Sequence, residues 1–172
     1  MWKWVRRVCL AAAAIVVLLF IWVAIAQPFA TGWMLRSRLL SEISDARNVA
    51  IVEHSSPWDR LPALGSNDAT DAEKVYKKVD LNAEQIAELR GCLIPSLDFS
   101  RWGRIMCFEP HHRIEIQHLD GKTTSVEICF HCGNLAINGE DDRIMPLGWS
   151  GRFSSFFASL GLRPNADFHA PR

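Results

Sequence analysis

The residues whose types and spacing best suit chemistry are cysteines and histidines in the second half of the chain. The stretch EICFHCGN, residues 127–134, holds a C-x-x-C pair, Cys129 and Cys132, with His131 between the two cysteines. Cys107 precedes them in another apolar stretch. Thiols at this spacing can hold a metal ion, form a disulfide or exchange electrons, depending on the groups around them. The sequence assigns no catalytic residue, and these three interpretations stay open.

A metal site is one interpretation, and zinc is the cofactor that these residue types suit. Zinc favours four sulfur and nitrogen ligands in a tetrahedron, and a closed site usually has two C-x-x-C knuckles, whereas this chain has one. Neighbours along a strand point to opposite faces of a sheet, so His111 and His112 cannot easily share a metal ion. The candidate residues for a metal site or a disulfide are Cys107, Cys129, Cys132, His111, His112 and His131.

A structural role for the cysteines is the second interpretation, and the sequence favours it. Four cysteines follow the N-terminal apolar run, and an even number in an exported domain suggests disulfides, with three pairings. A bridge from Cys107 to Cys129 or Cys132 would tie neighbouring strands. Alternatively, Cys92 and at least one other cysteine are small buried hydrophobic residues. Either way, we expect a cysteine-stabilised core.

Thiol-redox chemistry is the third interpretation. A reactive thiolate usually lies at a helix N-terminus or beside a cation, but this pair leads into Gly133-Asn134, which is a turn signal. No G-x-S-x-G, P-loop or H-E-x-x-H motif occurs. The isolated His54 and His118 are typical of surface or satisfied core residues. We therefore expect a non-enzymatic binding or structural module, with a metal-binding or thiol-redox protein as the alternative.

The N-terminal residues differ sharply in composition from the rest. Residues 8–26 contain no charged side chain, and a helix of that length would about cross the roughly 30 Å hydrocarbon core of a bilayer. Trp2 and Trp4 precede the run and Trp33 follows it, as in interfacial belts. A cleaved signal peptide ending at Ala24-Ile25-Ala26 is the competing interpretation. We expect a single-pass anchor in a bacterial inner membrane, with the domain in the periplasm or outside the cell.

The charge balance indicates which partners to expect. Lys3, Arg6 and Arg7 are three of the 19 basic residues, so residues 31–172 hold 16 basic and 19 acidic side chains. A nucleic-acid partner would call for a concentrated basic face, so none is expected. The expected partners are the lipid bilayer, through residues 8–26, and another envelope protein.

These features predict four segments and one fold class. The segments are an anchor or signal sequence at 1–32, a stalk at 33–46, an extracytoplasmic domain at 47–162 and a disordered tail at 163–172. The fold class is α+β, in which a single N-terminal transmembrane helix is followed by a small, mainly antiparallel sheet packed with two helices.

Hydrophobic periodicity places the elements of the domain. The first helix, Asn82–Ile94, opens with capping-box spacing between Asn82 and Gln85, and the second, Ser150–Leu160, is capped by Ser150. Residues rich in Pro, Gly, Asn and Asp predict a loop over 60–73. A change from helical to two-residue periodicity marks the strands that follow the first helix. Strands are expected at 49–52, 74–79, 105–108, 113–118, 125–130 and 134–137.

A hairpin at Leu119-Asp120-Gly121 fixes the register of two strands. A three-residue loop puts Gly121 where the turn requires a left-handed residue, and it sets Ile114 opposite Val126. A two-residue loop would instead mix apolar and polar faces. The preferred register also pairs Arg113 with Glu127 as a cross-strand surface pair, and it places His111 opposite Cys129. Gly121, Arg113, Glu127 and Pro110 are therefore expected to have structural roles.

The motif around these strands resembles a known sequence pattern. The segments are CFEPHHRI at 107–114 and VEICFHC at 126–132. They resemble a family of uncharacterised bacterial exported or membrane-anchored proteins with a C-F-x-P-x-H-x-I/L motif, a glycine hairpin and a V-x-I-C-F-x-C motif. The likeness covers roughly residues 47–160. It implies no activity, but it implies that one constellation is formed by Cys107, Pro110, His112, Cys129 and Cys132. The family pattern often has arginine where this chain has His111.

Overall fold

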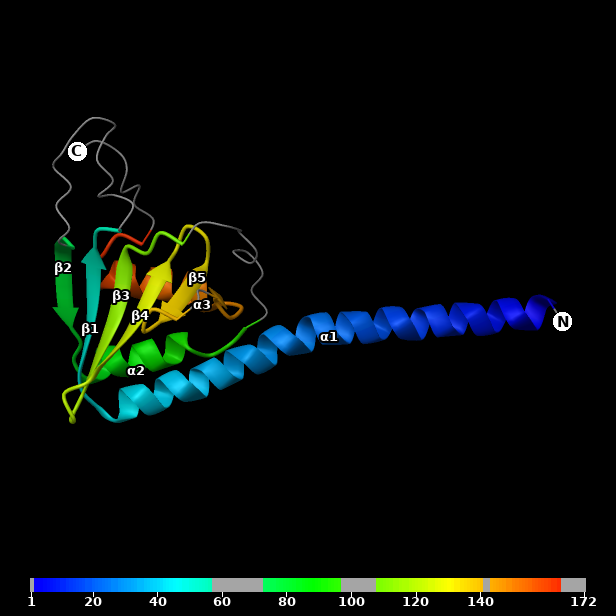
Figure 1. The fold of residues 1–172 in the computed structure, drawn as a ribbon, viewed down its shortest axis with the longest axis horizontal. Helices are drawn as coiled ribbons and strands as arrows, with labels where there is room; N and C mark the ends of the chain where they lie inside the picture. Colours follow the sequence, from blue (N-terminus) through cyan, green and yellow to red (C-terminus); the bar gives the residue numbers. More distant parts are fainter. Residues whose placement is uncertain (1, 57–72, 97–107, 141–142, 165–172) are drawn as a thin grey trace, which may run out of the picture.

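A computed structural model describes residues 2–56, 73–96, 108–140 and 143–164 (Figure 1). Within these ranges the chain is α+β, and its sheet is antiparallel, which agrees with the predicted class. The elements in chain order are α1 (Trp2–Ser44), β1 (Ala46–His54), β2 (Val75–Asp80), α2 (Ala83–Cys92), β3 (His112–His118), β4 (Thr123–Cys129), β5 (Asn134–Ile137), β6 (Arg143–Ile144) and α3 (Trp149–Ser159).

The strands form one sheet in the order β2-β1-β3-β4-β5-β6, with every neighbouring pair antiparallel. The predicted strand at 134–137 has the observed bounds, whereas the predicted strand at 49–52 is part of the longer β1. Most of the predicted loop at 60–73 and of the predicted strand at 105–108 lies outside the described residues, as does nearly all of the tail at 163–172.

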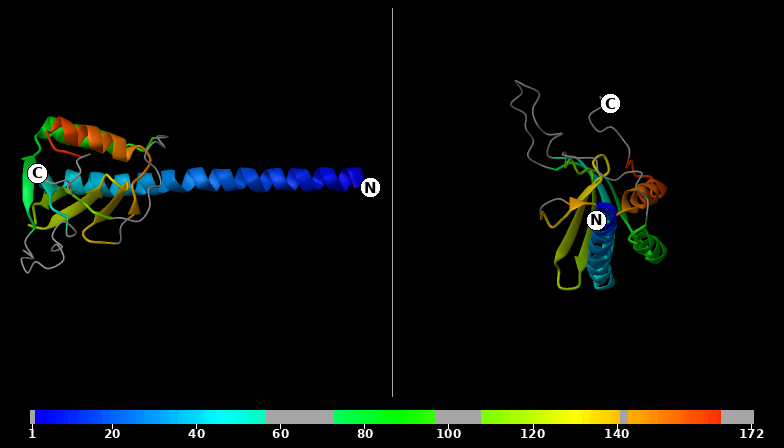
Figure 2. Two further views of the ribbon diagram at one scale, coloured as in Figure 1. Left: turned by 90° about the horizontal axis from the view of Figure 1, so that it is seen from above. Right: turned by 90° about the vertical axis from the view of Figure 1, so that its right-hand side faces the viewer.

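Among the residues that the structure describes, the helices lie against one face of the sheet and no helix lies on the other, which is called the uncovered face below (Figures 1 and 2). Alternate strand residues such as Ile51, Ile114 and Ile128 point into this layer and are buried. They pack against the aromatic stripe of α3, which includes Phe153 and Phe157. The intervening strand residues point to the uncovered face, where many of them are charged.

The β3–β4 hairpin has the predicted register. Ile114 pairs with Val126 and Arg113 with Glu127, as the three-residue loop requires. Gly121 has a φ of 85°, a left-handed conformation that suits glycine. The hairpin therefore confirms the register on which the position of His111 depends.

The two helices of the domain begin differently. Asn82 and Gln85 form the predicted capping box of α2: the Gln85 N–H donates to the Asn82 side chain at 2.9 Å, and the Asn82 N–H donates to the Gln85 side chain at 3.0 Å. The prediction that Ser150 caps α3 is wrong. The N-cap is Gly148, and Ser150 lies inside the first turn.

The C-terminal part of α1 belongs to the domain core. Leu35, Leu39 and Ile43 recur at four-residue spacing, so they share one helix face, and all three are buried in the core cluster. Residues 33–44, interpreted from sequence as a stalk, thus continue α1 and pack on the helix-covered side of the sheet. Gly32 lies close to the domain as well, since a Cβ there would be 3.0 Å from the Pro146 side chain.

The predicted membrane-spanning helix is not borne out. Among the residues that the structure describes, no helix combines the length and the apolar content that a bilayer crossing requires. The apolar run at 8–26 is no separate element. It forms part of the 43-residue helix α1, which continues into charged residues such as Arg36 and Arg38. The expectation of a transmembrane or signal anchor is corrected on this ground.

Candidate functional site

The C-x-x-C pair lies in the tight turn between β4 and β5. Cys129 is the last residue of β4 and pairs with Asn134, the first residue of β5. The Gly133 N–H closes the turn by donating to the Cys129 carbonyl at 3.0 Å. Because Cys132 lies within this turn, both cysteines are at the same end of the sheet.

The surroundings of Cys129 favour its thiolate. The largest effect is the hydrogen bond from the Cys132 thiol, which lowers the pKa of Cys129 to about 6 against the opposing effect of burial. Backbone N–H groups of Cys132, Glu109 and His131 lower this pKa further. The residue is only 1% exposed. The turn therefore favours a negative charge on the Cys129 sulfur.

Cys92 shows the opposite behaviour. It is buried in the core at the end of α2, and burial raises the pKa of its thiol to about 11. Its sulfur donates to the Arg152 carbonyl at 3.7 Å. Cys92 is thus the small buried hydrophobic residue that one interpretation of the sequence predicts, and it is unreactive at neutral pH.

The predicted disulfide is wrong for the cysteines that the structure describes. Cys92, Cys129 and Cys132 are free cysteines, as is Cys9 in α1. Cys129 and Cys132 share a hydrogen bond rather than a covalent bond, and Cys92 belongs to a helix on the other side of the sheet from the Cys129 side chain. Cys107, the remaining predicted partner, lies outside the described residues.

His111 lies next to this turn, as the register predicts. His112 pairs with Ile128, so one further step along the ladder sets His111 opposite Cys129. The His111 Nδ1 donates to the Glu109 carbonyl at 3.1 Å. The His54 N–H donates to the His111 carbonyl at 2.9 Å. His54 at the end of β1, His111 directly before β3 and Cys129 at the end of β4 therefore follow one row across the sheet.

Of the other two candidate histidines, His112 points away from Cys129, and His131 lies in the same turn with an exposed side chain. His112 points to the helix-covered face, where its ring centroid lies 5.1 Å from that of Phe130 and 5.7 Å from that of Phe157. Burial lowers the pKa of His112 to about 3, so this ring is neutral. His131 is exposed in the turn.

The described residues contain only part of a possible set of metal ligands. Within those ranges, no group of three or more His, Cys, Asp or Glu side chains is placed to hold a metal ion. Cys129 and Cys132 are the thiols that lie together there. Pro110, predicted to be structural, is buried in the segment that leads into β3.

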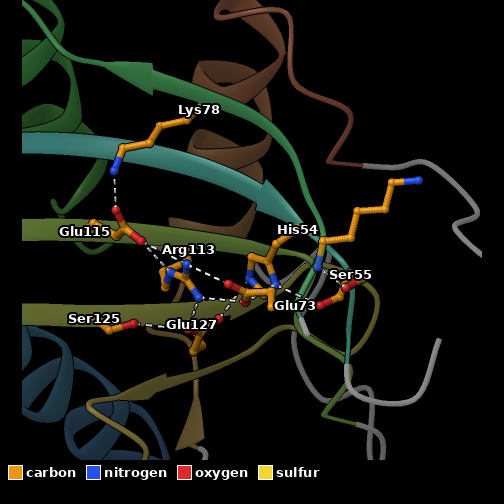
Figure 3. A network of polar contacts seen from close by, with 9 residues as sticks. His54, Ser55, Glu73, Lys78, Arg113, Glu115, Ser125 and Glu127 are labelled. Carbon is orange, nitrogen blue, oxygen red and sulfur yellow. Dashed lines mark hydrogen bonds and ion pairs between the residues drawn. The ribbon is translucent and has the colours of Figure 1, made fainter. Parts of the chain in front are cut away.

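A polar network on the uncovered face was largely missed from sequence (Figure 3). Its centre is Arg113, whose Nη1 lies 3.5 Å from Glu127, the predicted cross-strand partner. Arg113 also contacts Glu73 and Glu115, each at 2.8 Å, and Lys78 extends the chain of ion pairs from Glu115 at 2.7 Å. Hydrogen bonds and charges from Glu73, Glu127 and Glu115 outweigh burial and raise the pKa of Arg113.

His54 ends this network as a buried cation. Its Nδ1 faces the Ser55 carbonyl and Glu73, both at 3.0 Å, and its Nε2 faces Glu127 at 3.1 Å. Carbonyls and carboxylates only accept hydrogen bonds, so both ring nitrogens must donate. Burial opposes this charge, but the contacts with Glu127, Ser55 and Glu73 raise the pKa of His54 above its usual value. His54 is therefore an imidazolium held between two carboxylates.

Part of this network had a signal in the sequence. Arg113 and Glu115 alternate with apolar residues, as do Ser125 and Glu127, so the hairpin register puts them on one face. The contribution of His54 depends on how β1 pairs with β3, for which no short turn provides a register signal.

Comparisons with known proteins do not add a family. No protein-family model, curated protein or solved structure matches the chain. The resemblance to exported bacterial proteins stays a prediction from the motif.

Proposed function

We propose that the protein is a non-enzymatic metal-binding module, in which Cys129 and Cys132 provide thiolate ligands for Zn²⁺. The observation that carries this proposal is the buried Cys129 sulfur, whose pKa is lowered to about 6 by the Cys132 thiol and by backbone N–H groups.

A buried thiolate needs a compensating positive charge. Placing an isolated anion away from water is costly, and buried charges in proteins are paired or bind metals. The largest effect that lowers the pKa of Cys129 is the hydrogen bond from the Cys132 thiol, and backbone N–H groups add to it. Zn²⁺ binds thiolates directly and would neutralise this charge. N–H groups that point at a sulfur are also typical of the shell that orients metal ligands.

His111 and Cys107 are the proposed further ligands. The bond from His111 Nδ1 to the Glu109 carbonyl selects the tautomer whose lone pair is on Nε2. Metal-binding histidines usually donate their other N–H in this way. Cys107 is proposed from the sequence alone, as the thiol two residues before Glu109.

A purely structural role for the thiols is the alternative function. It is favoured by the burial of Cys132, which is 2% exposed, and by the tight packing of the turn between two strands. In that case Cys129 and Cys132 stabilise a binding module in the cell envelope without any metal.

Metal analysis of the full chain tests the two roles. The protein is purified under reducing conditions without chelator, and zinc per chain is measured by mass spectrometry. The same measurement is made on the variants Cys129→Ser and Cys92→Ala. We expect about one zinc per chain in the wild type and in Cys92→Ala, and loss of zinc in Cys129→Ser. Absence of zinc in the wild type, together with failure to take up Co²⁺ with a thiolate charge-transfer band, would leave the structural role.

A further inference from the structure

The N-terminus of α3 has a set of hydrogen-bond donors for which the described residues provide no side-chain cap. The helix has 11 residues and follows Gly148, with no side-chain cap and no acidic residue in its first turn. The Trp149 N–H donates to the Pro146 carbonyl at 3.1 Å, and the Arg152 N–H donates to the Gly148 carbonyl at 3.4 Å. The two N–H groups between them, in the first turn, have no acceptor within the helix.

The side chain of Ser150 adds a donor at the same place. Ser150 is 6% exposed, and its hydroxyl oxygen is buried without a hydrogen-bond partner. Side chains on a helix lean toward its N-terminus, so the hydroxyl lies at the end where the N–H groups of Ser150 and Gly151 point. The neighbouring Trp149 is fully buried, and its indole nitrogen also lacks a partner. Buried polar groups without partners are uncommon in native proteins, which points to a group that completes them.

The backbone next to these N–H groups is partly exposed, and the Ser96 hydroxyl lies close to it. Gly148 and Gly151 flank the site, are partly exposed and have no side chain to cover the N–H groups. Gly148 has a φ of 79°, and a Cβ there would lie 1.9 Å from the Ser96 hydroxyl, so a larger residue cannot replace it.

All the polar groups at this end favour negative charge. The first-turn N–H groups and the Ser150 hydroxyl are donors, and the helix dipole places partial positive charge at its N-terminus. Arg152, in the next turn, adds a full positive charge and donates to the Ile94 carbonyl at the end of α2. A cation would have no ligand among these donors.

We propose that the N-terminus of α3 binds a phosphate group, held by the N–H groups of Ser150 and Gly151 and by the Ser150 hydroxyl. A tetrahedral oxyanion offers several acceptor oxygens to donors that converge at a helix end. The phosphate can be soluble or carried by a phospholipid headgroup. Both sources fit the position, since α3 begins at the end of the domain from which α1 extends (Figures 1 and 2).

Phosphate titration of the full chain tests the site. Inorganic phosphate is titrated against sodium chloride of equal ionic strength, while thermal unfolding and the amide NMR signals of Ser150 and Gly151 are followed. We expect saturable shifts of both amides and a rise in Tm with phosphate alone. Ser150→Ala should weaken the phosphate response roughly tenfold, because it removes a hydrogen bond to a charged group.

Two further variants separate binding from folding. Ser155→Ala is the matched control, since Ser155 lies on the same helix and its hydroxyl donates to the Gly151 carbonyl. It should keep the wild-type response. Ser150→Asp places a carboxylate at the helix N-terminus, so it should fold, raise Tm without phosphate and abolish the phosphate response. A wild type that responds equally to phosphate and chloride, or a Ser150→Ala variant that responds as the wild type does, would overturn the proposal.

Vesicles identify the source of the phosphate. The wild type and Ser150→Ala are compared on phosphatidylcholine vesicles with and without phosphatidic acid. A preference for phosphatidic acid that Ser150→Ala removes supports a headgroup phosphate. Equal binding to both vesicles, together with the response to inorganic phosphate, supports a soluble phosphate.

Discussion

The Nε2 of His54 lies 3.1 Å from the Glu127 carboxylate, although the two residues are 73 positions apart in the sequence. The contact joins β1 to β4 across β3, on the face of the sheet that no helix covers. Glu127 also accepts the Ser125 hydroxyl at 3.0 Å and lies 3.5 Å from the Arg113 guanidinium, so one carboxylate contacts three other side chains of the network. This arrangement requires a charged His54, which makes the stability of the domain depend on pH.

Raising the pH should remove the contribution of His54 to stability. The pKa of His54 is raised in the folded state, so its stabilising effect is complete below the unfolded value near 6.5 and is lost as the pH rises through the folded value. His54→Gln should therefore destabilise the protein most near pH 6 and progressively less above it. Urea unfolding of both proteins across pH 6–10 measures this, and a difference independent of pH would contradict the charged state of His54.

Lowering the pH should act through His112. The pKa of His112 is lowered to about 3 by burial, so the unfolded chain binds a proton below pH 6.5 that the folded protein does not. Stability should fall by about 1.4 kcal/mol per pH unit between 6.5 and 3 from this group. His112→Leu keeps an apolar side chain against Phe130 and Phe157. It should flatten the dependence of stability on pH between 6.5 and 3. If the free energy of unfolding of His112→Leu fell with pH as steeply as that of the wild type, other groups would be responsible for the loss of stability in acid.

Gly121→Ala should destabilise the hairpin by about 1 kcal/mol, because φ is 85° there and a left-handed conformation is unfavourable for alanine. Space is no obstacle, since a Cβ at this position meets nothing within 4 Å. Urea unfolding measures the loss. Gly121→Asn tolerates the conformation better and should recover part of the stability; equal stability of all three proteins would contradict the turn geometry.

Asn82→Ala should also cost about 1 kcal/mol, since it removes the capping box of α2. Asn82→Ser keeps a capping oxygen and is the matched control. Thermal unfolding should rank the proteins as wild type, serine variant and alanine variant, with the alanine variant lowest. A serine variant no more stable than the alanine variant would exclude the cap as the cause.

The sequence was sufficient where local signals determine the structure. The capping box at Asn82 and the hairpin at Gly121 each depend on residues within a few positions. Both were predicted, and the hairpin was predicted with its register. From the hairpin register followed the pairing of Arg113 with Glu127 and the position of His111 opposite Cys129. These are contacts between neighbouring strands joined by a short turn.

Contacts that depend on long-range packing were not predictable from the sequence. His54 was interpreted as an isolated histidine, because its partners Glu73 and Glu127 come from other parts of the chain. The apolar run at 8–26 was read as a separate membrane span because its composition is local information. The burial of Leu39 at the end of the same helix appears only once the sheet is in place.

The most direct test of the proposed metal site is the zinc content of the full chain, measured beside the reactivity of its thiols. Zinc and free thiols are determined on one reduced sample, before and after a chelator. The account predicts about one zinc per chain, slow alkylation of Cys129 and Cys132 in the zinc-bound protein, and faster alkylation of both after chelation, while Cys92 stays unmodified until unfolding. A zinc-free protein in which a chelator changes no alkylation rate would contradict it.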